Sequence, residues 1–298
     1  MATSIPASNT ARAARDRSFS HPLEVIERFG RNRIALAGLV MLLLMLGASA
    51  LAGVILPYNP DTADLTATLH PPVWTHPFGT DQLGRDILTR VVYGGRISLV
   101  IGVLAVALSA AIGVPLGILS GFYAGAIDAV IQRIVDVMLA FPGFLLALTL
   151  ISVLGVGLTN VVISVGIASV PIYIRLVRGV ALTIREMTYV ESARAIGQRD
   201  RLIMFRHVLP NVAAPIVVQS SLQLGAAILT AAGLGFLGLG VTPPTPEWGT
   251  MLGEAQTYLL SSWFIAPFPG LAIFLAVMAF NLLGDGLRDA LDPRMKVL

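Results

Sequence analysis

Six long apolar segments, separated by polar stretches, dominate the pattern of the chain. The first extends from Ile34 to Leu56 and holds 23 residues without a charge, enough for a helix to cross about 30 Å of hydrocarbon. The others are Ile97–Phe122, Ile131–Leu154, Val161–Val180, Val212–Val241 and Pro267–Leu287. We therefore predict an all-α integral membrane protein with six transmembrane helices.

Proline and glycine residues interrupt several of these segments. Neighbouring helices can satisfy the backbone groups that a proline frees inside a membrane bundle, so each proline predicts a kink in its span rather than a loop. Gly113 and Gly117 form a G-x-x-x-G step, which is typical of close helix–helix contact. The prolines concerned are Pro115, Pro142, Pro171 and Pro215.

Composition agrees with the membrane assignment. Of the 298 residues, 55% are hydrophobic and only 12% are charged, whereas a soluble domain carries about 25% charged residues. The absence of cysteine excludes disulfides, a thiol nucleophile and Cys-ligated metal. We expect no metal site, because the four histidines are scattered along the sequence, at His21, His70, His76 and His207.

Basic residues orient the predicted spans. With the amino terminus inside, 17 of the 20 Lys and Arg residues fall on the inner side, leaving Arg85, Arg90 and Arg96 outside, as the positive-inside rule requires. Both termini are therefore expected in the cytoplasm. The positive charge lies beside apolar segments, which indicates contact with membrane lipid rather than nucleic acid. Ala48-Ser49-Ala50 resembles a signal-peptidase site, but the apolar run continues past it and predicts an uncleaved anchor.

Two outer segments are too long to be simple turns. From Pro57 to Gly95, a short helix is expected at about Asp81–Tyr93, with Leu83, Ile87 and Val91 opposite Arg85 and Arg90. A second short helix, carrying Glu254 and Gln256, is expected between Pro243 and Trp263. Both could roof a pore, but we expect them to rest on the membrane interface.

The longest inner segment between two spans extends from Arg185 to Asn211. Met187, Val190, Ala193 and Ile196 give it an apolar side, while Glu191, Arg194, Gln198 and Arg201 form a polar stripe. Gly197 can end a first helix through positive φ, Asp200 can cap a second, and Pro210 suits the first turn of the next span. Such a segment could dock on a cytoplasmic partner or lie on anionic lipid, and its spacing does not decide between them.

A family resemblance favours docking. Glu191-Ser192-Ala193, then Gly197, then Leu209-Pro210 resemble the E-A-A…G…L-P loop of binding-protein-dependent ABC importer permeases, with Ser192 in place of the middle alanine. The resemblance implies that this loop contacts an ATPase subunit. We expect Arg194 and Arg201, which belong to the polar stripe of the same segment, to take part in the contact.

Four further blocks resemble the second, shorter permease of the dipeptide, oligopeptide, glutathione and nickel branch of that family. They begin at His76, Arg133, Leu234 and Phe280, and the likeness covers about Gly30 to Pro293. It implies one amino-terminal span plus a five-span core in a bacterial inner membrane. The partners it implies are a second homologous permease, two ATPase subunits and an extracytoplasmic binding protein, with nickel as an alternative solute to peptides.

The predicted spans, their orientation and the family resemblance together divide the chain into segments on either side of the membrane and within it. These are a cytoplasmic arm (1–33), the first span (34–56), a periplasmic loop (57–95), a permease core (96–287) and a cytoplasmic tail (288–298). The core includes the coupling segment (185–211) and an outer loop (242–266).

Nucleotide chemistry is not expected on this chain. A P-loop requires a lysine followed by Ser or Thr, but the single lysine, Lys296, precedes Val297. ATP and magnesium would therefore bind to partner chains, and this subunit would not be an enzyme. Gly233 to Gly238 matches G-x-G-x-x-G, but it ends a membrane segment, so close packing or a broken helix is expected instead of a cofactor site.

Ion-coupled carriers and passive channels remain alternative classes. Carriers usually place ionisable groups at mid-membrane, whereas Arg133 and Asp136 are expected near an inner span end, where they could form an ion pair or a helix cap with a structural role. The intramembrane polar residues are candidates for the translocation pathway, with interhelical hydrogen bonding as the alternative. They are Gln219, Ser220, Ser221, Gln223 and Asn281.

Overall fold

The computed structural model describes residues 22–291, and no β-strand forms within that range. Its α-helices are α2 (Pro22–Arg31), α3 (Arg33–Ile55), α4 (Ile87–Tyr123), α5 (Gly125–Leu139), α6 (Gly143–Leu154), α7 (Leu158–Arg185), α8 (Thr188–Ala195), α9 (Asp200–Ile203), α10 (Leu209–Phe236), α11 (Trp248–Ala255) and α12 (Pro267–Leu291). A π-helical turn, Met204–Val208, joins α9 to α10.

Six membrane spans account for most of these helices, as predicted. Five are single helical stretches long and apolar enough to cross a bilayer, and they contain α3, α4, α7, α10 and α12. The sixth is the pair α5 and α6, which meet at an angle of 90°. Pro142 lies at this break, immediately before α6, whereas Pro115, Pro171 and Pro215 lie inside continuous helices. One of the four prolines therefore divides its span.

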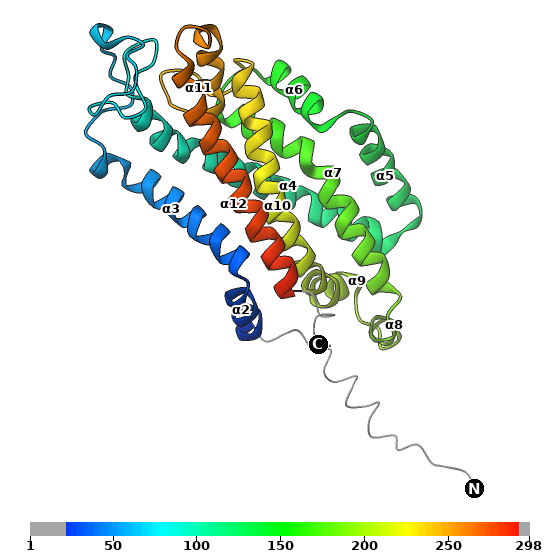
Figure 1. Cartoon of the computed structure of the whole chain (residues 1–298). Helices are drawn as coiled ribbons and strands as arrows, with labels where there is room; N and C mark the ends of the chain where they lie inside the picture. The colour runs from blue at the N-terminus through cyan, green and yellow to red at the C-terminus, as the bar shows by residue number, and fades with distance from the viewer. Residues whose placement is uncertain (1–21, 292–298) are drawn as a thin grey trace.

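The centre of the bundle is the contact between α4 and α7 (Figure 1). A Cβ atom on Gly113 would lie 2.5 Å from Cβ of Tyr173, and one on Gly117 would lie 2.7 Å from Cβ of Val177. The two backbones can approach this closely only because both positions lack a side chain, so the predicted role of the G-x-x-x-G step is confirmed. Helix α10 packs on α4, α7 and α12, and α3 packs on the outer side of α12.

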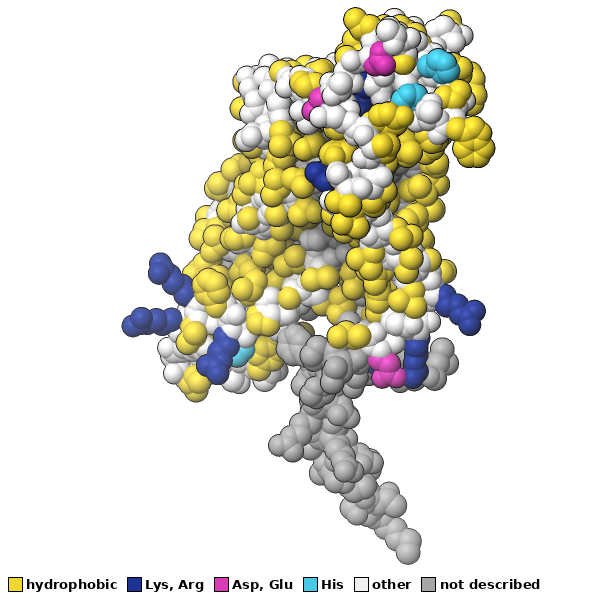
Figure 2. Space-filling model, turned by 90° about the vertical axis from the view of Figure 1, so that its left-hand side faces the viewer, with side chains coloured by type: hydrophobic (Ala, Val, Ile, Leu, Met, Phe, Trp, Pro, Cys, Tyr) yellow, Lys and Arg dark blue, Asp and Glu magenta, His cyan; other side chains and the backbone are white. Residues whose placement is uncertain are grey.

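The outer surface of the bundle is apolar. Figure 2 shows a broad band of hydrophobic side chains between one end that carries Lys and Arg and another that carries acidic and histidine side chains. On α3, Val40, Leu43 and Leu44 are 53%, 57% and 68% exposed. Water does not favour such a surface, and hydrocarbon does.

The two ends of the bundle differ in structure. One end, which we call the elbow end, carries α8, α9 and the π turn; residues 188–208 are named the elbow. The start of α3 and the end of α12 also lie there, where Asn32 Nδ2 donates to Asp289 Oδ2 at 3.2 Å. The opposite end carries residues 57–86 and 242–266, named the cap (Figure 1).

Three predicted elements differ from the structure. The helix expected at 81–93 is not separate, because α4 begins at Ile87 and continues for 37 residues through the membrane segment. The span expected at 131–154 begins earlier, at Gly125, and is broken. Helix α10 ends at Phe236, so the last residues of the span expected to reach Val241 form the turn that leads into the cap.

Candidate functional site

The elbow is a helix–turn–helix whose turn is fixed by Gly197. At this residue φ is +81°, a conformation that glycine adopts without strain. The Gly197 N–H donates to the Arg194 carbonyl at 2.9 Å, and the Gln198 N–H donates to the Ala193 carbonyl at 3.0 Å. These two bonds form a Schellman motif, which ends α8 and turns the chain toward α9.

The second elbow helix starts differently from the prediction. Asp200 is its first residue, and no side chain caps it; Arg199 occupies the capping position with extended backbone. The Arg199 carbonyl accepts the N–H groups of Leu202 and Ile203. Pro210 lies in the first turn of α10, as expected, but the π turn makes α9 and α10 one continuous path.

Small and branched residues attach the elbow to the bundle. Val190, Ala193, Ile203 and Val208 are buried, and they pack in one cluster with residues from the ends of α4, α7 and α10. The predicted apolar side is therefore half right. Val190 and Ala193 face the core, but Met187 and Ile196, which flank α8, are 43% and 83% exposed.

The opposite side of the elbow presents apolar and charged groups together. Phe205 is 70% exposed and Leu202 is 49% exposed. Glu191, Ser192 and Arg201 are also exposed. The Arg194 guanidinium lies over the Phe122 ring, 4.8 Å from its centroid, which fixes this cation beside the end of α4. The elbow thus offers a rigid mixed surface, typical of protein contact.

The rear of the elbow is tied to α10 through an aromatic pair. The Tyr189 and His207 rings lie 5.7 Å apart, and Asn211 Nδ2 donates to the His207 carbonyl at 2.6 Å. Partial burial raises the pKa of the Tyr189 phenol. Leu209, beside this pair, is half-buried, and Pro210 is exposed.

The candidate pathway residues occupy different environments. Tyr173 Oη donates to Ser220 Oγ at 3.0 Å, and Gln223 Nε2 donates to Ser169 Oγ at 3.0 Å. Both bonds join α7 to α10, so Ser220 and Gln223 make interhelical hydrogen bonds, the alternative to a role in the pathway. Gln219 is half-buried in α10, whereas Asn281 is exposed on α12. The structure does not bring these residues together as one site.

The expected pair of Arg133 and Asp136 does not form. Asp136 instead accepts a hydrogen bond from Arg175 Nη2 at 2.8 Å, and Arg133 has no polar contact among residues 22–291. Asp136 also lies eleven residues into α5, so it does not cap the helix. The sequence prediction failed because the partner lies on another helix, 39 residues away.

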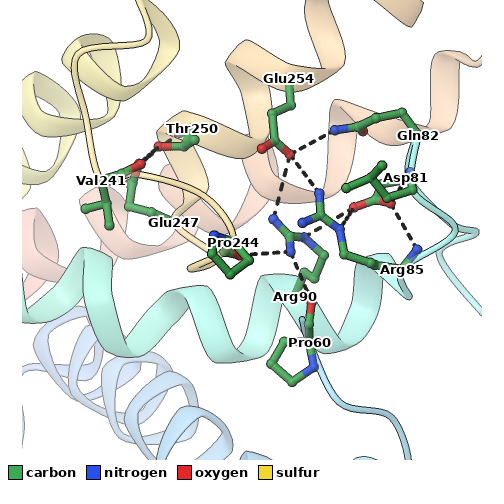
Figure 3. A network of polar contacts seen from close by, with 11 residues as sticks. Pro60, Asp81, Gln82, Arg85, Arg90, Val241, Pro244, Glu247, Thr250 and Glu254 are labelled. Carbon is green, nitrogen blue, oxygen red and sulfur yellow. Dashed lines mark hydrogen bonds and ion pairs between the residues drawn. The ribbon is translucent and has the colours of Figure 1, made fainter. Parts of the chain in front are cut away.

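The cap contains a buried ionic network that the sequence analysis missed (Figure 3). Arg85 donates to Asp81 at 2.6 Å and to Glu254 at 3.2 Å. Arg90, only 1% exposed, lies 3.4 Å from Asp81 and 3.7 Å from Glu254. It also donates to the Pro60 and Pro244 carbonyls. Two arginines and two carboxylates thus join residues 57–86 and 242–266 into one cap.

Another buried carboxylate, that of Glu247, fixes α11 on α4. Glu247, 2% exposed, accepts the Gly249 and Thr250 N–H groups at the start of α11 and the Ser98 hydroxyl of α4 at 2.9 Å. Trp248 Nε1 donates to the Val91 carbonyl at 2.8 Å. Gly235 packs against this corner and Gly233 packs against Phe144 of α6, whereas Gly238 has a φ of +77° in the turn after α10. Close packing and a turn therefore account for the G-x-G-x-x-G match.

Comparison with known proteins agrees with this architecture. A family model described as the binding-protein-dependent transport system inner membrane component matches residues 113–297. A second, the N-terminal TM domain of oligopeptide transport permease C, matches residues 23–72. Together they cover the first span and the core from residue 113 onward.

Curated relatives align over nearly the whole chain. The glutathione transport system permease protein of Pectobacterium atrosepticum is 47% identical, over 95% of this chain and 94% of that one. The di/tripeptide transport system permease protein of Pseudomonas aeruginosa is 45% identical, over 92% of each.

Among solved structures, a chain of the inward-facing MetNI methionine ABC transporter has a TM-score of 0.56 at 18% identity, covering 68% of this chain and 97% of that one. That likeness concerns the fold alone.

Proposed function

The chain belongs to the family of binding-protein-dependent transport system inner membrane components, and from that membership we propose that it is one of two permease subunits of an ATP-driven importer for peptides. The supporting observation is the extent of the likeness: the relatives, which are named for glutathione and di/tripeptide transport, align with 95% and 92% of this chain. The solute would be a di- or oligopeptide or glutathione; nickel is the alternative that the family resemblance leaves open.

The elbow is the proposed contact with an ATPase subunit. Exposed Ile196 and Phe205, beside exposed Glu191 and Arg201, suit a groove that accepts an apolar side chain within a charged rim. The elbow is continuous with α10 and is joined by two residues to α7. A push on the elbow would therefore move two spans together, and this movement would switch the bundle between inward- and outward-facing states.

The remaining partners follow from this role. ATP and magnesium would be held by two ATPase subunits, so the chain itself would be non-catalytic. A second, homologous permease would complete the pathway, and a binding protein would deliver solute at the cap. The elbow and both termini would then be cytoplasmic, which agrees with the Arg residues at the elbow end.

Reconstituted uptake tests the ATP dependence. Proteoliposomes that contain this chain, its partner permease, the ATPase subunits and the binding protein should accumulate peptide only with ATP, and uptake should persist when ionophores collapse the ion gradients. Uptake by the purified chain alone, driven by a proton gradient, would establish an ion-coupled carrier. Downhill flux without ATP would establish a channel.

Two substitutions test the elbow in the same vesicles. Gly197→Trp should abolish uptake because tryptophan cannot adopt φ of +81° without strain, and Glu191→Arg should abolish it by reversing a charge of the contact surface. Gly47→Trp and Glu27→Arg are matched controls, because a Cβ on Gly47 meets nothing within 4 Å and Glu27 is an exposed residue outside the elbow. Unchanged uptake in both elbow variants would contradict the docking role.

A further inference from the structure

Three charged side chains lie on the surface of membrane spans. Arg133 and Asp136 are on α5, and Arg175 is on α7. The side chains of Arg175 and Asp136 are 54% and 58% exposed although they form an ion pair with each other. We name the surface formed by Arg133, Asp136, Ile172, Arg175 and Gly179 the charged face.

These charges lie well inside the bundle rather than at its end. Arg175 precedes the last residue of α7 by ten residues, and Asp136 follows the first residue of α5 by eleven, so each is about 15 Å from its helix end. Helix α7 has 28 residues and is about 42 Å long, roughly 12 Å more than the hydrocarbon thickness. Even if all of that excess projected at the elbow end, Arg175 would remain at hydrocarbon depth.

A neighbouring ion pair, Asp128 with Arg178, is more buried and has more hydrogen bonds than the Asp136–Arg175 pair. Asp128 accepts two hydrogen bonds from Arg178, both at 2.6 Å, and it is also bonded to the Ser120 hydroxyl. The side chains of Arg178 and Asp128 are only 33% and 15% exposed. By contrast, the Asp136–Arg175 pair has one hydrogen bond, and Arg133 beside it has no partner within residues 22–291.

Exposed charges at this depth require water or a polar partner, because hydrocarbon disfavours them strongly. The surface of α3 that carries Val40, Leu43 and Leu44 has no exposed charge and is compatible with lipid. An anionic lipid headgroup would suit Arg133 and Arg175, but Asp136 would repel it. A solute with both an ammonium and a carboxylate group can pair with all three.

We propose that the charged face lines the aqueous translocation pathway, and that Arg133, Asp136 and Arg175 exchange contacts with the charged ends of a zwitterionic peptide. The inference rests on the proposed importer function. Asp136 would bind the ammonium group of the peptide, and Arg133 or Arg175 would bind its carboxylate. The Asp136–Arg175 ion pair would form again after the solute has passed.

Cysteine accessibility tests the location of the face, and the chain has no native cysteine. Ile172→Cys and Gly179→Cys flank Arg175 on α7, and Leu44→Cys, on α3, is the control at a similar distance from its helix end. In membranes that contain the assembled transporter, a charged thiosulfonate reagent should modify the two α7 cysteines roughly tenfold faster than Leu44→Cys, because only hydrated thiols ionise. Equal, slow modification would mean that lipid or the second permease covers the face, and would overturn the proposal.

Transport kinetics test the solute contact. Asp136→Asn should raise KM roughly tenfold for a dipeptide with free ends and leave KM unchanged for its N-acetylated form, which has no ammonium group. An equal change for both peptides would show a structural role for the pair and overturn the contact. If the wild-type transporter takes up neither peptide, the proposed solute class fails, whereas the labelling result still decides where the pathway lies.

Discussion

Replacing Glu247 by glutamine should strongly destabilise the cap. The side chain is 2% exposed, and both carboxylate oxygens are used. Oε1 accepts from the Ser98 hydroxyl and the Gly249 N–H, each at 2.9 Å. Oε2 accepts from the Thr250 N–H at 2.8 Å and from the Thr250 hydroxyl at 3.1 Å. In Glu247→Gln, either orientation of the amide places an NH₂ group against a backbone N–H donor, that of Gly249 or that of Thr250.

The size of the effect follows from these contacts. One buried backbone donor loses its acceptor and the other hydrogen bonds lose their charged partner, so the free energy of unfolding should fall by about 2–3 kcal/mol. Glu186→Gln is the control: it breaks a pair with Arg185 in which the glutamate side chain is 71% exposed, and it should cost less than about 1 kcal/mol.

Unfolding in mixed detergent micelles measures the difference. Titration with dodecyl sulfate can be followed by tryptophan fluorescence, because buried Trp248 lies next to the substitution, and by far-UV circular dichroism as a second probe. If Glu247→Gln and Glu186→Gln unfold at the same detergent fraction, the carboxylate does not hold α11 on α4 and the reasoning is wrong.

Two further predictions concern the bundle and the cap. Gly113→Leu should lower the free energy of unfolding by about 2–3 kcal/mol through overpacking, since a Cβ there meets Cβ of Tyr173 at 2.5 Å. Gly47→Leu is the control and should leave the free energy of unfolding unchanged, because a Cβ on Gly47 meets nothing within 4 Å. Equal stability of the two variants would contradict the close α4–α7 contact. Thr66→Ala should raise the pKa of Asp64, because the hydrogen bond from the Thr66 side chain is the largest cause of its lowered value. The ionised carboxylate stabilises this turn above the unfolded-state pKa, and in the variant that stabilisation should be lost at a higher pH than in the wild type as the pH falls. Carboxyl NMR titration measures the pKa, and an unchanged value would contradict the bond.

Local patterns in the sequence predicted the parts of the fold that depend on neighbouring residues. Apolar segments of sufficient length locate all six spans, because hydrophobic length alone decides whether a helix can cross hydrocarbon. Gly197 marks the elbow turn for a similar reason, since a residue at positive φ directly after a helix is usually glycine.

Contacts between distant segments were not predictable in this way. Asp136 pairs across 39 residues with Arg175, and Arg85 pairs across 169 with Glu254. Periodicity placed Arg85 and Arg90 on an exposed polar side, but the carboxylates of a later segment allow both to be buried. The signal available in the sequence was Glu254, one of only two charged residues in the outer loop 242–266, which a search for partners of the outer arginines could have found.

The central claim is that the elbow receives force from an ATPase subunit, and photo-crosslinking tests it most directly. A photoreactive amino acid at Ile196, 83% exposed at the elbow turn, is compared with one at Leu65, 74% exposed in the cap. In the assembled transporter, Ile196 should yield a covalent adduct with the ATPase subunit and Leu65 should yield none. An adduct of Ile196 with lipid or with the binding protein, and none with the ATPase, would contradict the account.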